Sequence, residues 1–347
     1  MDLPGEKLVI KLWETLADKG IGSLLAPWQV GREGRARNEI RRHEILMLAQ
    51  AEADAADIRS GKKQLRSDGA LLPTNSADIR SDMDERIEPT LGLSKAVEYG
   101  SRASAAAAAR SEINATKAIL FAEEQLSIDQ EVPSDRPVDD DWLFTWREHA
   151  GKVSTEDLQR LWGSVLAGEV KAPGRYSIRT LEFLKTLSKS EAETISKLAG
   201  YVINGCIARS QNAYLESKGI SFGTLLEMQD LGVISGVEAL GLAQNYPSTA
   251  PDRFIRALVC HNKALILEHS DASKIVEIEV YMLTAVGRQV LGLGSFEADT
   301  DYLRLVGKKL LNDGFTVKLG DWQNVSDTQG RFYNAQEIKD DGTPAGD

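Results

Sequence analysis

One stretch, residues 141–187, constrains the fold of this chain more than any other part. It reads DWLFTWREHAGKVSTEDLQRLWGSVLAGEVKAPGRYSIRTLEFLKTL and holds Trp142, Trp146 and Trp162, half of the tryptophans in the chain. Large aromatic side chains this close together bury enough apolar surface to anchor a domain core. The stretch therefore predicts a helical core that neighbouring segments pack around.

Capping residues divide this stretch into helices. Asp139 and the two aspartates after it precede an apolar run and suit the positive end of a helix. Gly151 is the expected end of that helix. Ser154 is the expected N-cap of the next helix, with Asp157 at its third position as a variant of the capping box. The apolar residues that follow recur at the spacing of a helix packed along one face.

A sharp turn follows the second helix. Pro173 and Gly174 end that helix, and Ser177 is the expected cap of a third one. Glu169 and Arg179 flank the turn, which we interpret as a structural hinge, with an ion pair or a ligand contact as the alternative. The expected structural core combines apolar and turn residues: Trp142, Trp146, Leu161, Trp162, Leu166, Pro173 and Gly174.

The run LWGSVLAGEVKAPGRYSIRTLEFLKTLSKSEA resembles the signature of a bacterial family known only as a domain of unknown function, number twenty-eight-oh-six. The resemblance covers residues 139–192, and the phrases KLWETLADKGIGSLLAPWQ and AEADAADIRSGKK also look similar to that family. No catalytic residues come with the resemblance. It implies a bacterial cytosolic setting and an anti-phage or mobile-element neighbourhood.

Length and composition bound the remaining possibilities. A chain of 347 residues with 42% hydrophobic residues predicts two or three units with cores of their own. The net charge of −11 argues against a surface devoted to nucleic acid. Cys206 and Cys260 lack CxxC spacing, which fits a reducing compartment and argues against zinc or a disulfide scaffold. No signal peptide and no apolar run of the ~20 residues that span a bilayer is apparent, so we expect a soluble, cytoplasmic protein with no cofactor and no metal.

Residues 5–19 predict a short amphipathic helix. Leu8, Leu12, Trp13 and Leu16 lie along one of its sides. Mixed charges on the opposite side favour packing of this apolar face against protein. Contact with a membrane surface or a partner is the alternative.

Two longer helices are expected after it. Residues 32–62 contain no proline, and their apolar positions repeat near an 11-residue spacing that is typical of a right-handed coiled coil. Residues 95–126 carry a run of alanines that lets another helix approach closely. The polar residues 64–94 between them predict a loop or insertion. A helix of about thirty residues spans about 45 Å, more than a small domain buries, which favours self-association.

The first long helix carries a basic cluster: Arg32, Arg35, Arg37, Arg41 and Arg42. Interleaved glutamates favour a solvated face with ion pairs, and phosphate contact is the alternative. The sequence RNEIRRH also matches the loose arginine, polar residue and histidine pattern of helical ribonucleases of the HEPN type. In such an enzyme Arg37 would steady phosphate charge and His43 would move a proton.

After residue 187 the pattern changes. Helices are expected at 190–205 and from residue 222 to Gly232, followed by two alternating β-rich runs, RALVCHNKALILEH and KIVEIEVYML, and by a helix that Thr284 caps. This succession resembles a winged-helix arrangement, in which the second helix often reads DNA. Here that helix carries Glu227 and Asp230 and no lysine or arginine, so we expect it to pack against protein.

The predicted fold class is therefore mainly α with a smaller α+β part: long N-terminal helices, a central helical core and a winged-helix-like C-terminal domain. The expected segments, in order, are 1–63 (amphipathic helix and long helix), 64–94 (polar loop or insertion), 95–126 (alanine-rich helix), 127–138 (linker), 139–187 (tryptophan-rich core), 188–295 (winged-helix-like domain), 296–323 (terminal helix and strand) and 324–347 (loosely ordered tail).

The sequence contains no motif that indicates a particular reaction. It contains no phosphate-binding loop, metalloprotease helix or nucleophile elbow, and its histidines lack metal-ligand spacing. We therefore favour a non-enzymatic, self-associating helical protein that acts as a scaffold, sensor or effector in an anti-phage setting. The alternatives are a ribonuclease that uses Arg37 and His43, and a peripheral membrane or nucleic-acid binder. The expected partners are further copies of the chain and a protein from the same operon, while nucleic acid and a membrane surface are disfavoured.

Overall fold

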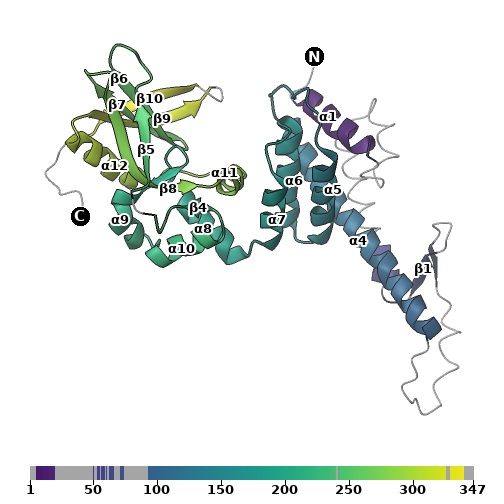
Figure 1. Cartoon of the computed structure of the whole chain (residues 1–347). Coiled ribbons are helices and arrows are strands. Elements are labelled where there is room, and N and C mark those ends of the chain that lie inside the picture. Colours follow the sequence, from purple (N-terminus) through teal and green to yellow (C-terminus); the bar gives the residue numbers. More distant parts are fainter. Residues whose placement is uncertain are drawn as a thin grey trace. The chain divides into compact units, whose positions relative to one another are not determined.

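The structure is a computed structural model that describes residues 5–19, 50, 53–54, 56–58, 60, 62–65, 71–73, 93–239, 241–325 and 329–339. The chain divides into two compact units, Met1–Leu181 (unit 1) and Glu182–Asp347 (unit 2), and the division falls inside helix α7 (Ile178–Thr186). Helices make up the larger part of the described residues and strands a smaller part (Figure 1). The chain is thus mainly α, as its sequence predicts.

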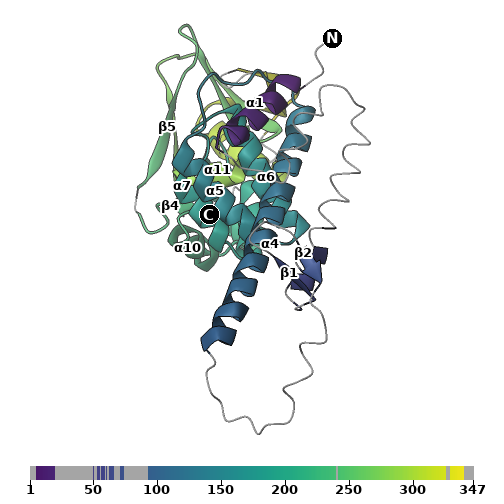
Figure 2. The same ribbon diagram turned by 90° about the vertical axis from the view of Figure 1, so that its right-hand side faces the viewer.

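Unit 1 is a helical assembly built around α4 (Leu93–Ser127), the longest of its described helices. Its elements are α1 (Glu6–Ala17), the antiparallel strands β1 (Lys63–Leu65) and β2 (Leu71–Pro73), α4, α5 (Asp140–Lys152), α6 (Glu156–Lys171) and the start of α7. Helix α4 packs against α1, α5 and α6 (Figure 1), and β1 lies beside it (Figure 2). Except for Lys63, the β1–β2 pair falls within the segment 64–94 that the sequence predicts as a loop, whereas the helix expected at 32–62 lies largely outside the described residues.

Close contact between α4 and α6 forms the centre of unit 1. Gly163 lies on α6, and a Cβ atom there would stand 2.8 Å from the carbonyl oxygen of Ala118 on α4. Because both residues are small, the two helices approach more closely than larger side chains would allow. Beside this contact, the indole Nε1 of the buried Trp146 donates to the carbonyl of Trp162 at 2.9 Å.

Of three helix ends expected in unit 1, one is confirmed and two are placed differently by the structure. Asp139 caps α5 as predicted, since its carboxylate accepts the N–H of Trp142 at 2.9 Å. Helix α5, however, continues through Gly151 to Lys152. A Cβ at Gly151 would lie 2.2 Å from the Ser111 hydroxyl, so this glycine serves helix packing and not helix termination. The N-cap of α6 is Thr155 and not Ser154, and its side chain makes no capping hydrogen bond.

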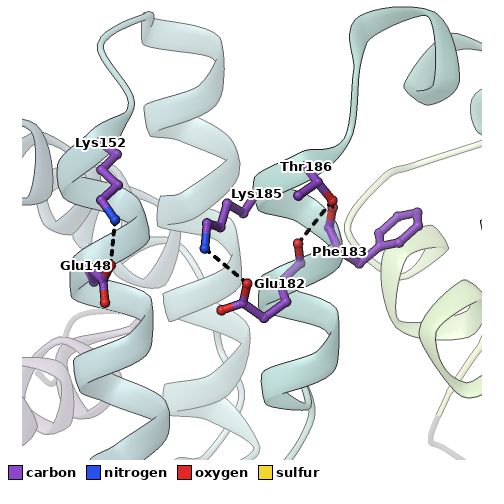
Figure 3. Close-up of polar contacts among 6 residues, drawn as sticks. All are labelled: Glu148, Lys152, Glu182, Phe183, Lys185 and Thr186. Atoms are coloured by element: carbon purple, nitrogen blue, oxygen red, sulfur yellow. Dashed lines mark hydrogen bonds and ion pairs between the residues drawn. The ribbon is translucent and has the colours of Figure 1, made fainter.

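Helices α5 and α7 each carry an ion pair between exposed side chains (Figure 3). On α5, Lys152 pairs with Glu148 at 2.5 Å. On α7, Lys185 pairs with Glu182 at 3.1 Å, and Thr186 donates back to backbone carbonyls of the same helix. Exposed pairs of this kind contribute about 0.3–0.5 kcal/mol each, so they keep the faces solvated and add little to stability.

Unit 2 combines short helices with two antiparallel sheets. Its elements are α8 (Lys189–Ala199), β3 (Cys206–Ala208), the 3-10 helix η4 (Arg209–Gln211), α9 (Asn212–Ser217), α10 (Phe222–Asp230), β4 (Ile234–Ser235), β5 (Ala243–Pro247), β6 (Phe254–Cys260), β7 (Lys263–His269), β8 (Ile275–Leu283), α11 (Ala285–Leu291), α12 (Thr300–Asn312), β9 (Thr316–Asn324) and β10 (Gly330–Glu337). In one sheet β8 lies between β3 and β4 and also pairs with β5; in the other the order is β10-β9-β7-β6.

Several local expectations for unit 2 are confirmed and two are wrong. Thr284 caps α11 by accepting the N–H of Gly287 at 3.0 Å, and the run RALVCHNKALILEH forms the β6–β7 hairpin. The helix expected at 190–205 ends at Ala199, because the chain turns there into β3. The tail expected to be loose from residue 324 contains β10, which pairs with β9 along most of its length.

Among the helices of the described residues, none combines the length and the apolar character that crossing a bilayer requires.

Candidate functional site

The signature segment of unit 1 forms a turn around one buried carboxylate. Glu169, at the end of α6, is 1% exposed and accepts the backbone N–H of Gly174 at 2.5 Å and that of Tyr176 at 2.9 Å. Gly174 has a φ of 90°, a conformation that favours glycine. Glu169 therefore holds the turn through backbone groups.

Burial is the main influence on the pKa values of the ionisable side chains in this turn. It raises the pKa of the Glu169 carboxyl above its ordinary value, against the opposing effect of the N–H groups of Gly174 and Tyr176. The ring of Tyr176 covers Gly168, where a Cβ would lie 2.6 Å from the ring. Burial likewise raises the pKa of the Tyr176 hydroxyl. The buried Glu169 carboxylate therefore holds the backbone of the turn in place and is not accessible to a ligand.

The other expected core residues mostly lie in the interior of unit 1. Trp142, Trp146, Trp162, Leu166 and Pro173 are buried. Leu161 is half-buried and Gly174 is exposed. The two that differ lie at the rim of the core, where α6 meets solvent and where the turn bends.

The apolar face of α1 is covered by the protein itself. Leu8, Leu12, Trp13 and Leu16 are all buried, and α1 packs against α4 and α6. These side chains contribute to the core of unit 1. The apolar face of α1 that contact with a membrane would require is therefore packed against protein.

The segment between α4 and α5, predicted as a linker, is fastened to unit 1. Lys171 of α6 pairs with Asp129 at 2.6 Å and with Glu131 at 2.9 Å. Lys11 of α1 donates to the carbonyls of Ser134 and Arg136. Two lysines from different helices therefore hold this segment against unit 1.

The first half of α4 is a candidate interaction surface. It extends beyond α1, α5 and α6 (Figure 1), and we call residues 97–110, which precede the α5 contacts of Ser111 and Glu112, the projecting half of α4. Val97 is 65% exposed and Tyr99 is 68% exposed, and within this half Ala106 is buried. From Ile113 onward the helix lies mostly in the core. One helix thus serves as a core element in its second half and presents apolar side chains to solvent in its first.

Helix α10 borders a second candidate surface in unit 2. A groove of about 400 Å³ lies between α8 and α10, and its acidic residues are Glu191, Glu227 and Asp230. Phe222, the first residue of α10, is 56% exposed. Glu191 belongs to the capping box of α8, because it accepts the N–H of Ser188 at 2.7 Å. The groove is therefore acidic, and the exposed Phe222 lies outside its lining, at the start of α10.

The residues on which a ribonuclease or phosphate contact would depend lie outside the described residues: Arg32, Arg35, Arg37, Arg41, Arg42 and His43. Across the ranges that are described, no group of three or more histidine, cysteine, aspartate or glutamate side chains has an arrangement that could hold a metal ion.

Comparison with known proteins finds a family that part of the chain matches. Residues 102–211, from α4 to η4, match the family described as protein of unknown function, DUF2806, which is the family that the signature resembles. The match includes the Glu169 turn and continues into the first elements of unit 2, and it does not include the two N-terminal phrases that look similar. No curated protein and no solved structure matches the chain.

Proposed function

We propose that this chain, whose residues 102–211 match a family of unknown function, is a non-enzymatic, self-associating protein that acts as a scaffold, sensor or effector. The observation that carries the proposal is the exposure of Val97 and Tyr99 on the projecting half of α4. A 35-residue helix is about 52 Å long, so a second copy could pack along this half and remove the apolar side chains from water. The bacterial, cytoplasmic and anti-phage setting rests on the family resemblance alone.

The solution molar mass tests self-association. We expect light scattering on a sizing column to give a multiple of 38.0 kDa for the wild-type chain. Val97→Glu and Tyr99→Glu place a charge on the projecting half of α4 and should lower the mass to that of one chain. Val132→Glu is the matched control, because Val132 is 80% exposed in unit 1 but lies outside α4. A monomeric wild-type chain at micromolar concentration would contradict the proposal.

We infer further that unit 2 is winged-helix-like. Support comes from the order of its elements: a helix (α8), a strand (β3), two helices (α9 and α10) and then β4 and β8, with β8 between β3 and β4 in the sheet. In this reading β5 and the first part of β8 form the wing, and the β6–β7 hairpin is an insertion between them.

In that arrangement α10 takes the position of a DNA-reading helix, yet it carries Glu227 and Asp230 and no basic residue. We propose that α10, with Phe222 and the acidic groove beside it, contacts a basic protein surface. Phe222→Ser should weaken such a contact and leave the helix capped by Ser221, which accepts the N–H of Thr224. A salt-dependent shift of duplex DNA by the wild-type chain would contradict this part of the proposal.

A further inference from the structure

A polar cleft of about 540 Å³ opens within unit 2 and shares no lining residue with the groove at α10. Its walls come from β5, from β6 and from the region where β9 ends. Amide side chains dominate the lining, among them Gln244, Asn245 and Asn324. The volume lies within the range of about 300–1,000 Å³ that is usual for small-molecule sites.

The charge of the cleft differs from that of the chain. The protein has 52 acidic and 41 basic residues, yet the described residues that line this cleft include one arginine, Arg256, and no carboxylate. The guanidinium of Arg256 lies over the ring of Tyr246, 5.5 Å from its centroid. Within the described part of the chain it makes no hydrogen bond or ion pair. Its positive charge is therefore available to an anionic group in the cleft.

Trp322 provides a fixed aromatic surface in the same cleft. Its indole Nε1 donates to the Oδ1 of Asn324 at 2.7 Å. The ring also packs on the backbone of β10 at Gly330, where a Cβ would lie 2.1 Å from the ring. Because a hydrogen bond and a glycine contact hold the indole, little conformational entropy is lost when a planar group stacks on it.

The amide groups complement this surface. Among the described residues, the side chain of Asn245 has no hydrogen-bond partner, and the Nδ2 of Asn324 has none either. An amide both donates and accepts, so it can pair with the mixed donor and acceptor edge of a nucleobase. A neutral sugar would also use the amides and the indole, but it would leave the charge of Arg256 without a counterpart.

We propose that this cleft binds a nucleotide, with the base stacked on Trp322, the amides at its edge and the phosphate at Arg256. This inference goes beyond the proposed self-association and does not depend on it, since every lining residue belongs to unit 2.

Calorimetric titration of the full chain with nucleoside monophosphates, the matching nucleosides and inorganic phosphate tests the proposal. We expect the monophosphate of at least one base to bind, and its nucleoside to bind at least about tenfold more weakly. Arg256→Gln should bring the monophosphate to the affinity of the nucleoside. Trp322→Leu should weaken binding roughly five- to 150-fold, the usual range for one stacked base, whereas Trp322→Phe should retain most of it.

Two exposed residues outside the lining provide matched controls. Arg253→Gln makes the same charge change as Arg256→Gln, and Tyr333→Leu removes an exposed aromatic ring from β10. Both should leave the affinity unchanged. The proposal is overturned if no monophosphate binds the wild-type chain at millimolar concentration, if inorganic phosphate binds as well as the nucleotides, or if Arg253→Gln weakens binding as much as Arg256→Gln.

Discussion

Asn204 and Val259 are joined by a reciprocal pair of hydrogen bonds. The backbone N–H of Asn204 donates to the carbonyl of Val259, and the N–H of Val259 donates to the Oδ1 of Asn204, each at 2.9 Å. The Asn204 Nδ2 also donates to the carbonyl of Ala257 at 3.3 Å. Strand β6 lies at the edge of its sheet, so Asn204 occupies groups that an edge strand leaves open to another chain. It also ties the turn before β3 to the second sheet.

Replacing Asn204 should loosen the edge of β6. Asn204 has a φ of 47°, so Asn204→Ala loses the side-chain hydrogen bonds and also places alanine in a strained conformation. We expect a cost of about 1–3 kcal/mol, with faster amide hydrogen exchange at Val259. Asn204→Gly should cost less, because glycine adopts this conformation readily. Asn334, which has a φ of 53° in the β9–β10 pair, gives the control Asn334→Ala, which should not change exchange at Val259.

Removing the Glu169 carboxylate should destabilise unit 1. Glu169→Ala leaves the N–H groups of Gly174 and Tyr176 without their acceptor, at a cost of roughly 1.5–3 kcal/mol in the free energy of unfolding. Urea denaturation followed by tryptophan fluorescence measures it. The exposed Glu156 lies on the same helix, and Glu156→Ala should change stability by less than about 0.5 kcal/mol. Equal effects of the two substitutions would show that the turn does not depend on Glu169.

The raised pKa of Glu169 gives this position a pH dependence. Because the folded pKa lies above the ordinary value of 4.5, the unfolded chain loses this proton first as the pH rises. The stabilising contribution of the protonated form is therefore present below 4.5 and lost as the pH rises through the folded value. We expect the free energy of unfolding of Glu169→Gln, relative to wild type, to improve between about pH 4 and about pH 7. A constant or opposite difference, corrected with Glu156→Gln, would contradict this sign.

The hydrogen bond between Trp146 and Trp162 should be measurable in stability. Trp146→Phe keeps an aromatic ring but removes the Nε1–H donor and part of the buried volume. We expect a loss of about 1–3 kcal/mol in urea denaturation. Phe144→Leu on the same helix, at a largely exposed ring, should cost much less. If the two substitutions cost the same, the indole contact is not a determinant of this core.

Both thiols should be unreactive in the folded protein. Burial raises the pKa of the Cys206 thiol and raises that of Cys260 to about 12. Thiolate is the reactive form, so an aromatic disulfide reagent at about pH 8 should titrate neither cysteine until denaturant is added, when both react. Rapid reaction of one thiol in the native chain would show that its site opens to solvent.

The sequence by itself determined the elements that depend on a few neighbouring residues. The N-caps at Asp139, Ser177 and Thr284 were predictable, because a capping side chain bonds to backbone only three residues away. The amphipathic helix at 5–19 and the β-rich runs of unit 2 were predictable for the same reason, since their periodicity is local.

Only the tertiary structure decided what depends on contact between distant segments. Gly151 resembles a helix stop in sequence, but its role comes from Ser111, forty residues earlier on α4. The cleft of unit 2 brings β5 and β6 together with the end of β9, and no local pattern marks Arg256 or Trp322 as neighbours of one site. The pairing of β10 with β9 was likewise visible only in the tertiary structure, because the sequence of a polar segment does not indicate which strand it pairs with.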